Sequence, residues 1–140
     1  MNIKFRFTFK PVQRSQRSLI YNWFAQTHIK EWLYGEGLRN TFEDLDKFFE
    51  GCSWGQHWIA YENDTPFAYL LTSCDGLDAI TLDLFICDLN YLGKGLSVQM
   101  IQEFLISEFP NKKEVLIDPE ALNMRAIHVY EKVGFRNATC

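Results

Sequence analysis

Two glycines flank a lysine where a predicted strand passes into a predicted helix. Gly93 and Gly95 lie in residues 90–97, whose sequence is NYLGKGLS. Glycine lets the backbone approach a ligand closely, and the N-terminus of the following helix adds about half a positive charge. The segment therefore predicts an anion site suited to phosphate or pyrophosphate, with Lys94 as a nearby cation. A tight turn that serves only packing has the same glycine spacing.

A second candidate site lies on one face of a predicted helix near the C-terminus, which carries two polar side chains. Asn123, Ala126, Ile127 and Tyr130 follow the spacing i, i+3, i+4, i+7, which is typical of one helical stripe. An amide and a phenol on one face can both hydrogen-bond a ligand. The alternatives are that Asn123 caps the helix and that Tyr130 packs in the core.

The elements that position these residues follow from periodicity. Ile3 to Lys10 alternate apolar and charged side chains, which predicts a half-buried strand closed by Pro11. Apolar residues at helical spacing predict helices over 15–26 and 28–33, with a break at 34–37. Thr41 and Asp44 resemble a capping box that opens a third helix ending near Gly51. Strands are predicted at 57–62, 66–73, 79–88 and 115–117, and helices at about 95–109 and 123–133.

This order of elements predicts a single mixed α/β domain over residues 1–140. Three strands joined by short turns form an antiparallel meander. A helix then crosses over to a strand that pairs in parallel with its predecessor. We therefore expect a mostly antiparallel sheet that contains one parallel pair.

Composition excludes several classes of function. The chain has 14 Lys and Arg against 18 Asp and Glu, for a formal net charge of −4, so nucleic acid is not an expected partner. No apolar run approaches the ~18 residues of a membrane span. No signal peptide is recognisable, which makes the cytoplasm the expected location. The four cysteines and three histidines do not fall at metal-ligand spacing, so no metal site is predicted.

The two polar motifs together resemble those of the GNAT superfamily of N-acetyltransferases. The likeness rests on the glycine turn and on residues 123–135, which follow a strand ending in Asp118-Pro119. It implies the GNAT fold, in which two parallel strands, here 79–88 and 113–118, splay apart to bind acetyl-CoA. The resemblance covers residues 3–135.

Within this superfamily the chain is most similar to the aminoglycoside 6′-N-acetyltransferases. The likeness lies in residues 22–23, 27–32, 92–96, 118–119 and 123–127; hydroxamate-siderophore acyltransferases share the stretch from His28 to Trp32. It implies an enzyme that transfers an acetyl group to a primary amine of a small cationic molecule. The alternatives are a protein or peptide amine acetyltransferase, or a non-catalytic CoA-binding module truncated at its last strand.

The resemblance also implies a role for each residue in donor binding. Tyr130 would protonate the leaving thiolate, and Asn123 would bind the pantetheine arm. A backbone N–H near Phe85 or Ile86 would stabilise the oxyanion. The pyrophosphate would be held by the backbone N–H groups of Leu92, Gly93, Lys94, Gly95, Leu96 and Ser97.

For the acceptor amine, the resemblance points to Asp83 and Asp118, which would bind the ammonium group and accept its proton. Asp83 interrupts an apolar strand, and Asp118 follows another. The alternatives are an exposed edge position for Asp83 and an Asp-Pro turn for Asp118. Trp32 and Tyr34 would wall the acceptor pocket, unless they form an aromatic lid on the core.

Two further expectations concern His28 and the C-terminus. His28 is expected to pack and hydrogen-bond rather than to act in catalysis. Only five residues follow Phe135, where the family continues into a last strand. The fold is therefore expected to lack that strand. The alternatives are that a neighbouring subunit covers the open sheet edge in a homodimer, that the fold does without the strand, or that the chain is truncated.

Overall fold

The computed structural model describes residues 4–74, 79–110, 112 and 114–116. Within them, five strands form one sheet in the order β1-β2-β3-β4-β5. The strands are β1 (Phe7–Pro11), β2 (Gln56–Glu62), β3 (Thr65–Cys74), β4 (Ala79–Ile86) and β5 (Glu114–Leu116). The helices are η1 (Arg14–Gln16), α1 (Arg17–Phe24), α2 (Thr27–Lys30), α3 (Gly35–Phe49) and α4 (Ser97–Glu108).

Strand directions confirm the predicted mixed sheet. β1, β2, β3 and β4 pair antiparallel in sequence order, whereas β4 and β5 pair in parallel, with Ala79 opposite Glu114. The parallel pairing needs a crossover, and α4 supplies it. The expected lack of a final strand, and the homodimer across the resulting edge, concern residues outside the described part of the chain.

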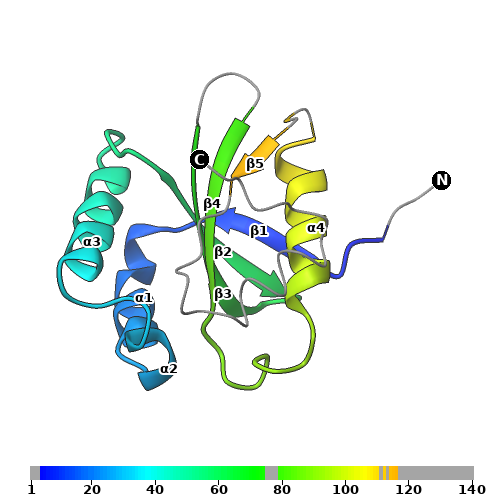
Figure 1. The fold of residues 1–140 in the computed structure, drawn as a ribbon, viewed down its shortest axis with the longest axis horizontal. Coiled ribbons are helices and arrows are strands. Elements are labelled where there is room, and N and C mark those ends of the chain that lie inside the picture. Colours follow the sequence, from blue (N-terminus) through cyan, green and yellow to red (C-terminus); the bar gives the residue numbers. More distant parts are fainter. Residues whose placement is uncertain (1–3, 75–78, 111, 113, 117–140) are drawn as a thin grey trace.

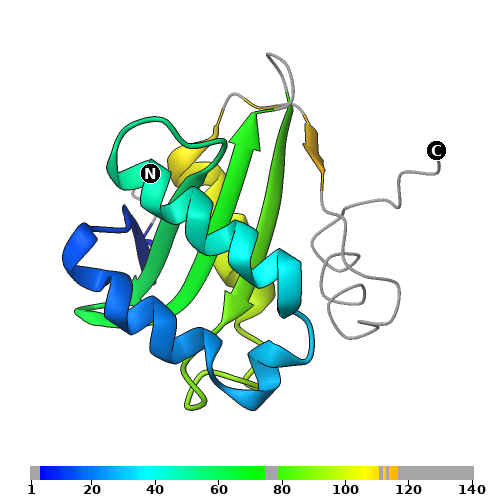
Figure 2. The same ribbon diagram turned by 90° about the vertical axis from the view of Figure 1, so that its left-hand side faces the viewer.

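Helices cover both faces of the sheet. In Figure 1, α1, α2 and α3 lie on one side of the strands and α4 on the other, and Figure 2 shows the first three helices in front of the sheet with α4 behind it. The core cluster on the α4 side includes Phe7, Trp58 and Phe104. The cluster on the other side includes Ile20, Phe24 and Tyr69. Because strand side chains alternate between faces, the inner strands β2, β3 and β4 contribute to both clusters.

Two predicted element boundaries are wrong. The first strand starts at Phe7 rather than Ile3, and Phe5 is 42% exposed. The third helix starts at Gly35, so Thr41 lies inside it and donates its hydroxyl to the carbonyl of Gly37. Gly35 and Gly37 weaken a helix by about 1 kcal/mol each. Packing of Leu38, Phe42 and Leu45 on the core outweighs that preference.

The C-terminal end of α3 confirms the predicted glycine stop. Gly51 has a φ of +81°. Its N–H donates to the carbonyl of Phe48, and the N–H of Cys52 donates to that of Lys47. These two bonds form a Schellman motif, which turns the chain from α3 toward β2.

Candidate active site

The predicted anion-binding turn joins β4 to α4. Gly93 and Gly95 have φ values of +76° and +71°, a region that side chains other than glycine rarely adopt. Just before them, the N–H groups of Asn90 and Tyr91 donate to the side chain and the carbonyl of Asp88. These bonds fix the start of the turn, so the glycines reverse the chain into α4.

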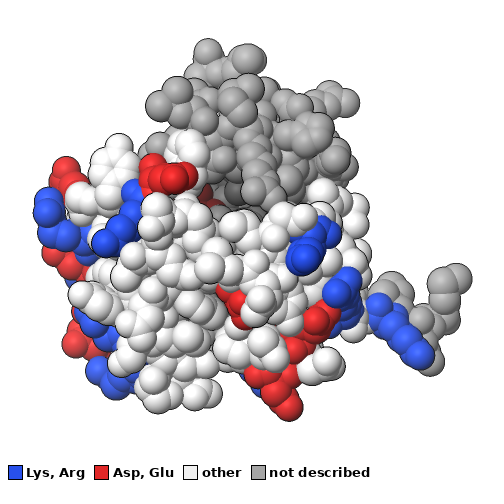
Figure 3. Space-filling view, turned by 90° about the horizontal axis from the view of Figure 1, so that it is seen from below, with Lys and Arg blue, Asp and Glu red and all other residues white. Residues whose placement is uncertain are grey.

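The first turn of α4 carries no competing anion. Leu96 occupies the N-cap, offers no side-chain acceptor, and is followed by no acidic residue in the first turn. The free N–H groups and the helix dipole there favour an anionic ligand. Figure 3 views the molecule from below, the side where Figure 1 places this turn; uncharged residues make up most of the middle of that face. Backbone groups, rather than a broad basic surface, are therefore suited to hold a phosphate.

Backbone alternation decides which groups of β4 face away from β3. The N–H of Cys87 donates to the carbonyl of Phe67, on the β3 side. Since N–H and C=O directions alternate along a strand, those of Phe85 also face β3, opposite Tyr69. Those of Ile86 face the other edge, where β5 pairs with residues 79–81 of β4. Of the two candidate oxyanion donors, Ile86 therefore directs its N–H toward that edge.

Asp83 lies in β4 opposite Leu71 of β3, with its side chain exposed. It lines an open pocket of about 470 Å³ between α3 and the sheet. Thr81 and Ser73 contribute to the same pocket, and α3 adds Asn40, Glu43 and Asp44. The pocket lining therefore contains three carboxylates and one cation, Lys47, and this excess of negative charge is suited to a cationic ligand.

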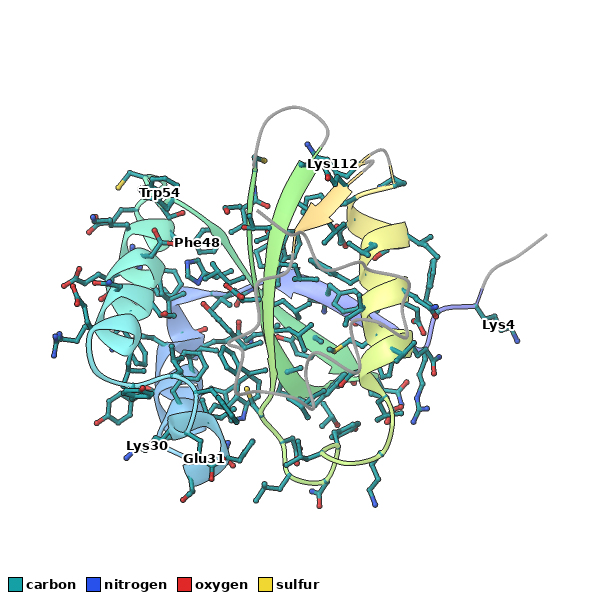
Figure 4. The ribbon with its side chains drawn as sticks, viewed as in Figure 1. Lys4, Lys30, Glu31, Phe48, Trp54 and Lys112 are labelled. Atoms are coloured by element: carbon teal, nitrogen blue, oxygen red, sulfur yellow. The ribbon has the colours of Figure 1, made fainter. Side chains whose placement is uncertain are left out.

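Asp44, at the wall of this pocket, is held by a buried hydrogen-bond network. Its carboxylate accepts the N–H groups of Trp54 and Gly55 and lies 2.7 Å from Nε2 of His57. The other ring nitrogen of His57, Nδ1, contacts the hydroxyl of Tyr69. His57 and Tyr69 are 0% and 1% exposed. Figure 4 labels Trp54 near the end of α3 that is farther from Lys30 of α2.

The pKa shifts of this network define its protonation state. Burial alone would raise the pKa of Asp44, but the hydrogen bonds from His57, Trp54 and Gly55 bring it below its usual value. Burial lowers the pKa of His57 more than Asp44 raises it. At neutral pH a neutral His57 therefore donates from Nε2 to an ionised Asp44 and accepts from Tyr69 at Nδ1. No pattern in the sequence pairs His57 with Asp44 or Tyr69, so the sequence does not predict this network.

His28 forms a hydrogen bond, as expected, and its partner, which the sequence does not predict, is the end of β4. Its Nε2 lies 3.0 Å from the carbonyl oxygen of Ile86. Trp32 is half-buried and Tyr34 is 64% exposed, and neither lines the pocket that contains Asp83. The structure therefore does not bring these two aromatic residues to Asp83.

The remaining predicted site residues, Asp118, Asn123 and Tyr130, lie outside the described residues.

Within the described part of the chain, no group of three or more His, Cys, Asp or Glu could hold a metal ion. No described helix is both long enough and apolar enough to cross a membrane.

Comparisons with known proteins agree with this architecture. Residues 14–139 match the acetyltransferase (GNAT) domain family. An aminoglycoside N(6′)-acetyltransferase type 1 from Klebsiella pneumoniae is 29% identical over 136 residues, which cover 84% of this chain and 68% of that protein.

Two solved structures share the fold closely. The crystal structure of an aminoglycoside N(6′)-acetyltransferase from Legionella pneumophila matches with a TM-score of 0.92 and 53% identity, covering 97% of this chain and 83% of that one. The structure of AAC(6′)-Ib in complex with ribostamycin and coenzyme A matches with a TM-score of 0.76 and 26% identity, covering 94% and 84%. The chain therefore belongs to the GNAT acetyltransferase family, and it is an N-acetyltransferase whose acyl donor is acetyl-CoA.

Proposed function

We propose that this enzyme acetylates a primary amine of a small, cationic, aminoglycoside-like molecule. The observation that carries the proposal is the position of the acidic pocket relative to the donor turn. Thr81 and Asp83 line the pocket from the first five residues of β4, whereas Gly93 and Gly95 follow the end of the same strand. Donor and acceptor would therefore approach the middle of β4 from opposite ends.

The described residues fit acetyl-CoA, which supplies the acetyl group as an activated thioester. The backbone of the turn from Leu92 to Ser97 has positive-φ glycines and an uncapped helix start, which suits a pyrophosphate. The outward-facing N–H of Ile86 is placed to donate to an acyl oxygen that becomes negatively charged. Asn123 would bind the pantetheine arm, as the family resemblance implies.

The acceptor side requires carboxylates because an ammonium group must lose a proton before it can attack. We assign Asp83, together with Asp118, to binding that ammonium group and accepting the proton, directly or through water. Attack by the amine on the acyl carbon forms the amide bond and breaks the C–S bond. Tyr130 would then donate its phenol proton to the leaving thiolate. Trp32 and Tyr34 would contact the acceptor at a position away from Asp83.

An acceptor panel tests this function. Thiol release from acetyl-CoA is measured with an aminoglycoside that has a 6′-amine, with the matched aminoglycoside that has a 6′-hydroxyl, with spermidine and with a lysine peptide. We expect rapid thiol release with the 6′-amine alone, and a product whose mass is larger by one acetyl group. Comparable turnover of the peptide, or of the 6′-hydroxyl compound, would contradict the proposed acceptor.

A further inference from the structure

Two side chains from the junction of α1 and α2 reach the end of β4. Nε2 of Gln26 donates to the carbonyl of Cys87 at 2.7 Å. Nε2 of His28 lies 3.0 Å from the carbonyl of Ile86. A carbonyl oxygen only accepts, so Nε2 of His28 carries the hydrogen of this bond.

The same two peptide units are also held from the β3 side. The N–H groups of Cys87 and Asp88 both donate to the carbonyl of Phe67, at 2.8 and 3.0 Å. Two donors on one carbonyl are the pattern of a β-bulge, which redirects a strand. The unit from Ile86 to Cys87 is therefore held between Phe67 and His28, and the next unit between Phe67 and Gln26.

Gln26 and His28, which together form a clamp on the end of β4, are themselves anchored in the core. The side chain of Gln26 also donates to the carbonyl of Trp23. The carbonyl of Gln26 accepts the N–H groups of Ile29 and Lys30, at 3.1 and 3.0 Å. Ile29 is 2% exposed. A shift of His28 would therefore disturb buried contacts, so the clamp is stiff.

The clamp acts next to the proposed oxyanion donor. Described pairing between β4 and β5 covers only residues 79–81 of β4. At Ile86 the backbone faces the outer edge, where its carbonyl is occupied by His28. The N–H of Ile86 belongs to the preceding peptide unit, which meets the held unit at the Cα of Ile86. Its orientation relative to the held unit is therefore set by the two backbone dihedrals of that one residue.

We propose that His28, assisted by Gln26, is a positioning residue for acetyl transfer. It holds the peptide between Ile86 and Cys87 so that the N–H of Ile86 faces the acyl oxygen. This inference rests on the proposed function. It gives His28 no role in proton transfer, because the hydrogen on Nε2 is already donated to the carbonyl oxygen of Ile86.

Paired variants separate positioning from acid–base chemistry. Glutamine places an amide nitrogen near the position of Nε2, so His28→Gln keeps the donor and removes the imidazole. Asparagine is shorter, so His28→Asn removes the bond. We expect His28→Gln to keep kcat within about threefold and to keep the pH profile. We expect His28→Asn to lower kcat by about 10- to 100-fold, part of the effect of losing an oxyanion donor, with a similar KM for acetyl-CoA.

Amide hydrogen exchange in the free protein provides a second readout. His28→Asn should accelerate exchange of the N–H groups of Cys87 and Asp88, and His28→Gln should not. Equal loss of kcat in both variants, or normal kcat in His28→Asn, would overturn the positioning role. Absence of turnover in the unaltered chain would refute the proposed function itself. In that case the exchange comparison would still test whether His28 holds the end of β4. Equal exchange rates at Cys87 and Asp88 in both variants would show that it does not.

Discussion

Asp83 lies at a position where a strand residue reaches an open pocket. Its side chain is exposed, and it shares the pocket with residues of α3 and β3. A carboxylate there adds negative potential to a space large enough for a small molecule. Electrostatic attraction of this kind selects cations and increases their local concentration.

Replacing Asp83 by asparagine tests that contribution while keeping side-chain size. We expect Asp83→Asn to lower kcat/KM for the amine acceptor at least tenfold, a loss of about 1.4 kcal/mol or more. Acetyl-CoA binding, measured by titration calorimetry, should stay unchanged because the donor turn lies beyond the far end of β4. Asp64→Asn is the matched control, since Asp64 is exposed in the turn between β2 and β3. Unchanged acceptor kinetics in Asp83→Asn would contradict the assignment.

At the scale of elements, the turn between β4 and α4 can be tested through its glycines. Gly95 and Gly51 both have positive φ, of +71° and +81°, and a Cβ added to either would meet no atom within 4 Å. A side chain at either position therefore strains the backbone without a clash. The two sites differ in location, because Gly51 ends α3 and Gly95 precedes α4.

We expect Gly95→Val to weaken acetyl-CoA binding at least tenfold, because the strained turn no longer presents its N–H groups. Gly51→Val should lower the melting temperature by about as much as Gly95→Val does, but it should leave acetyl-CoA affinity unchanged. Calorimetric titration and thermal unfolding of both variants make the comparison. Equal affinity for acetyl-CoA in the two variants would show that the pyrophosphate lies elsewhere.

Sequence predicted those features that depend on neighbouring residues. The glycine turn, the strand alternation at Phe7 and Phe9 and the glycine stop at Gly51 all follow from local backbone preference. Sequence failed at the start of α3, where contacts of Leu38 with the core outweigh two glycines. It also failed for bonds between distant elements: His28 meets Ile86 across 58 positions, and His57 meets Asp44 across 13. Residue type alone does not identify such partners.

At the scale of the whole molecule, the network of Asp44, His57 and Tyr69 joins α3 to β2 and β3. It connects the helical layer that walls the acceptor pocket to the sheet. Because His57 is fully buried, protonating it would place a charge in the contact between α3 and the sheet. Stability of this contact should therefore depend on pH.

The direction of that dependence follows from the lowered pKa of His57. In the unfolded chain His57 has its ordinary value, 6.5, and the folded value is lower because of burial. Between these values the unfolded state binds a proton that the folded state does not, so stability is complete above pH 6.5 and decreases as the pH falls. The slope contributed by one group is at most about 1.4 kcal/mol per pH unit. The lowered pKa values of Asp44 and Asp46 act in the same direction, but only below their ordinary value of 3.8.

Thermal unfolding between pH 7.5 and pH 5 therefore isolates the contribution of His57 from those of the carboxylates. We expect the melting temperature of the unaltered chain to decrease over this range. In His57→Gln it should start lower, because the contact of Nδ1 with the hydroxyl of Tyr69 is lost, and it should change less with pH, because an amide does not titrate. Only the slope tests the titration, since any damaging substitution lowers the starting value. Parallel slopes in the two proteins would show that His57 does not couple proton binding to folding.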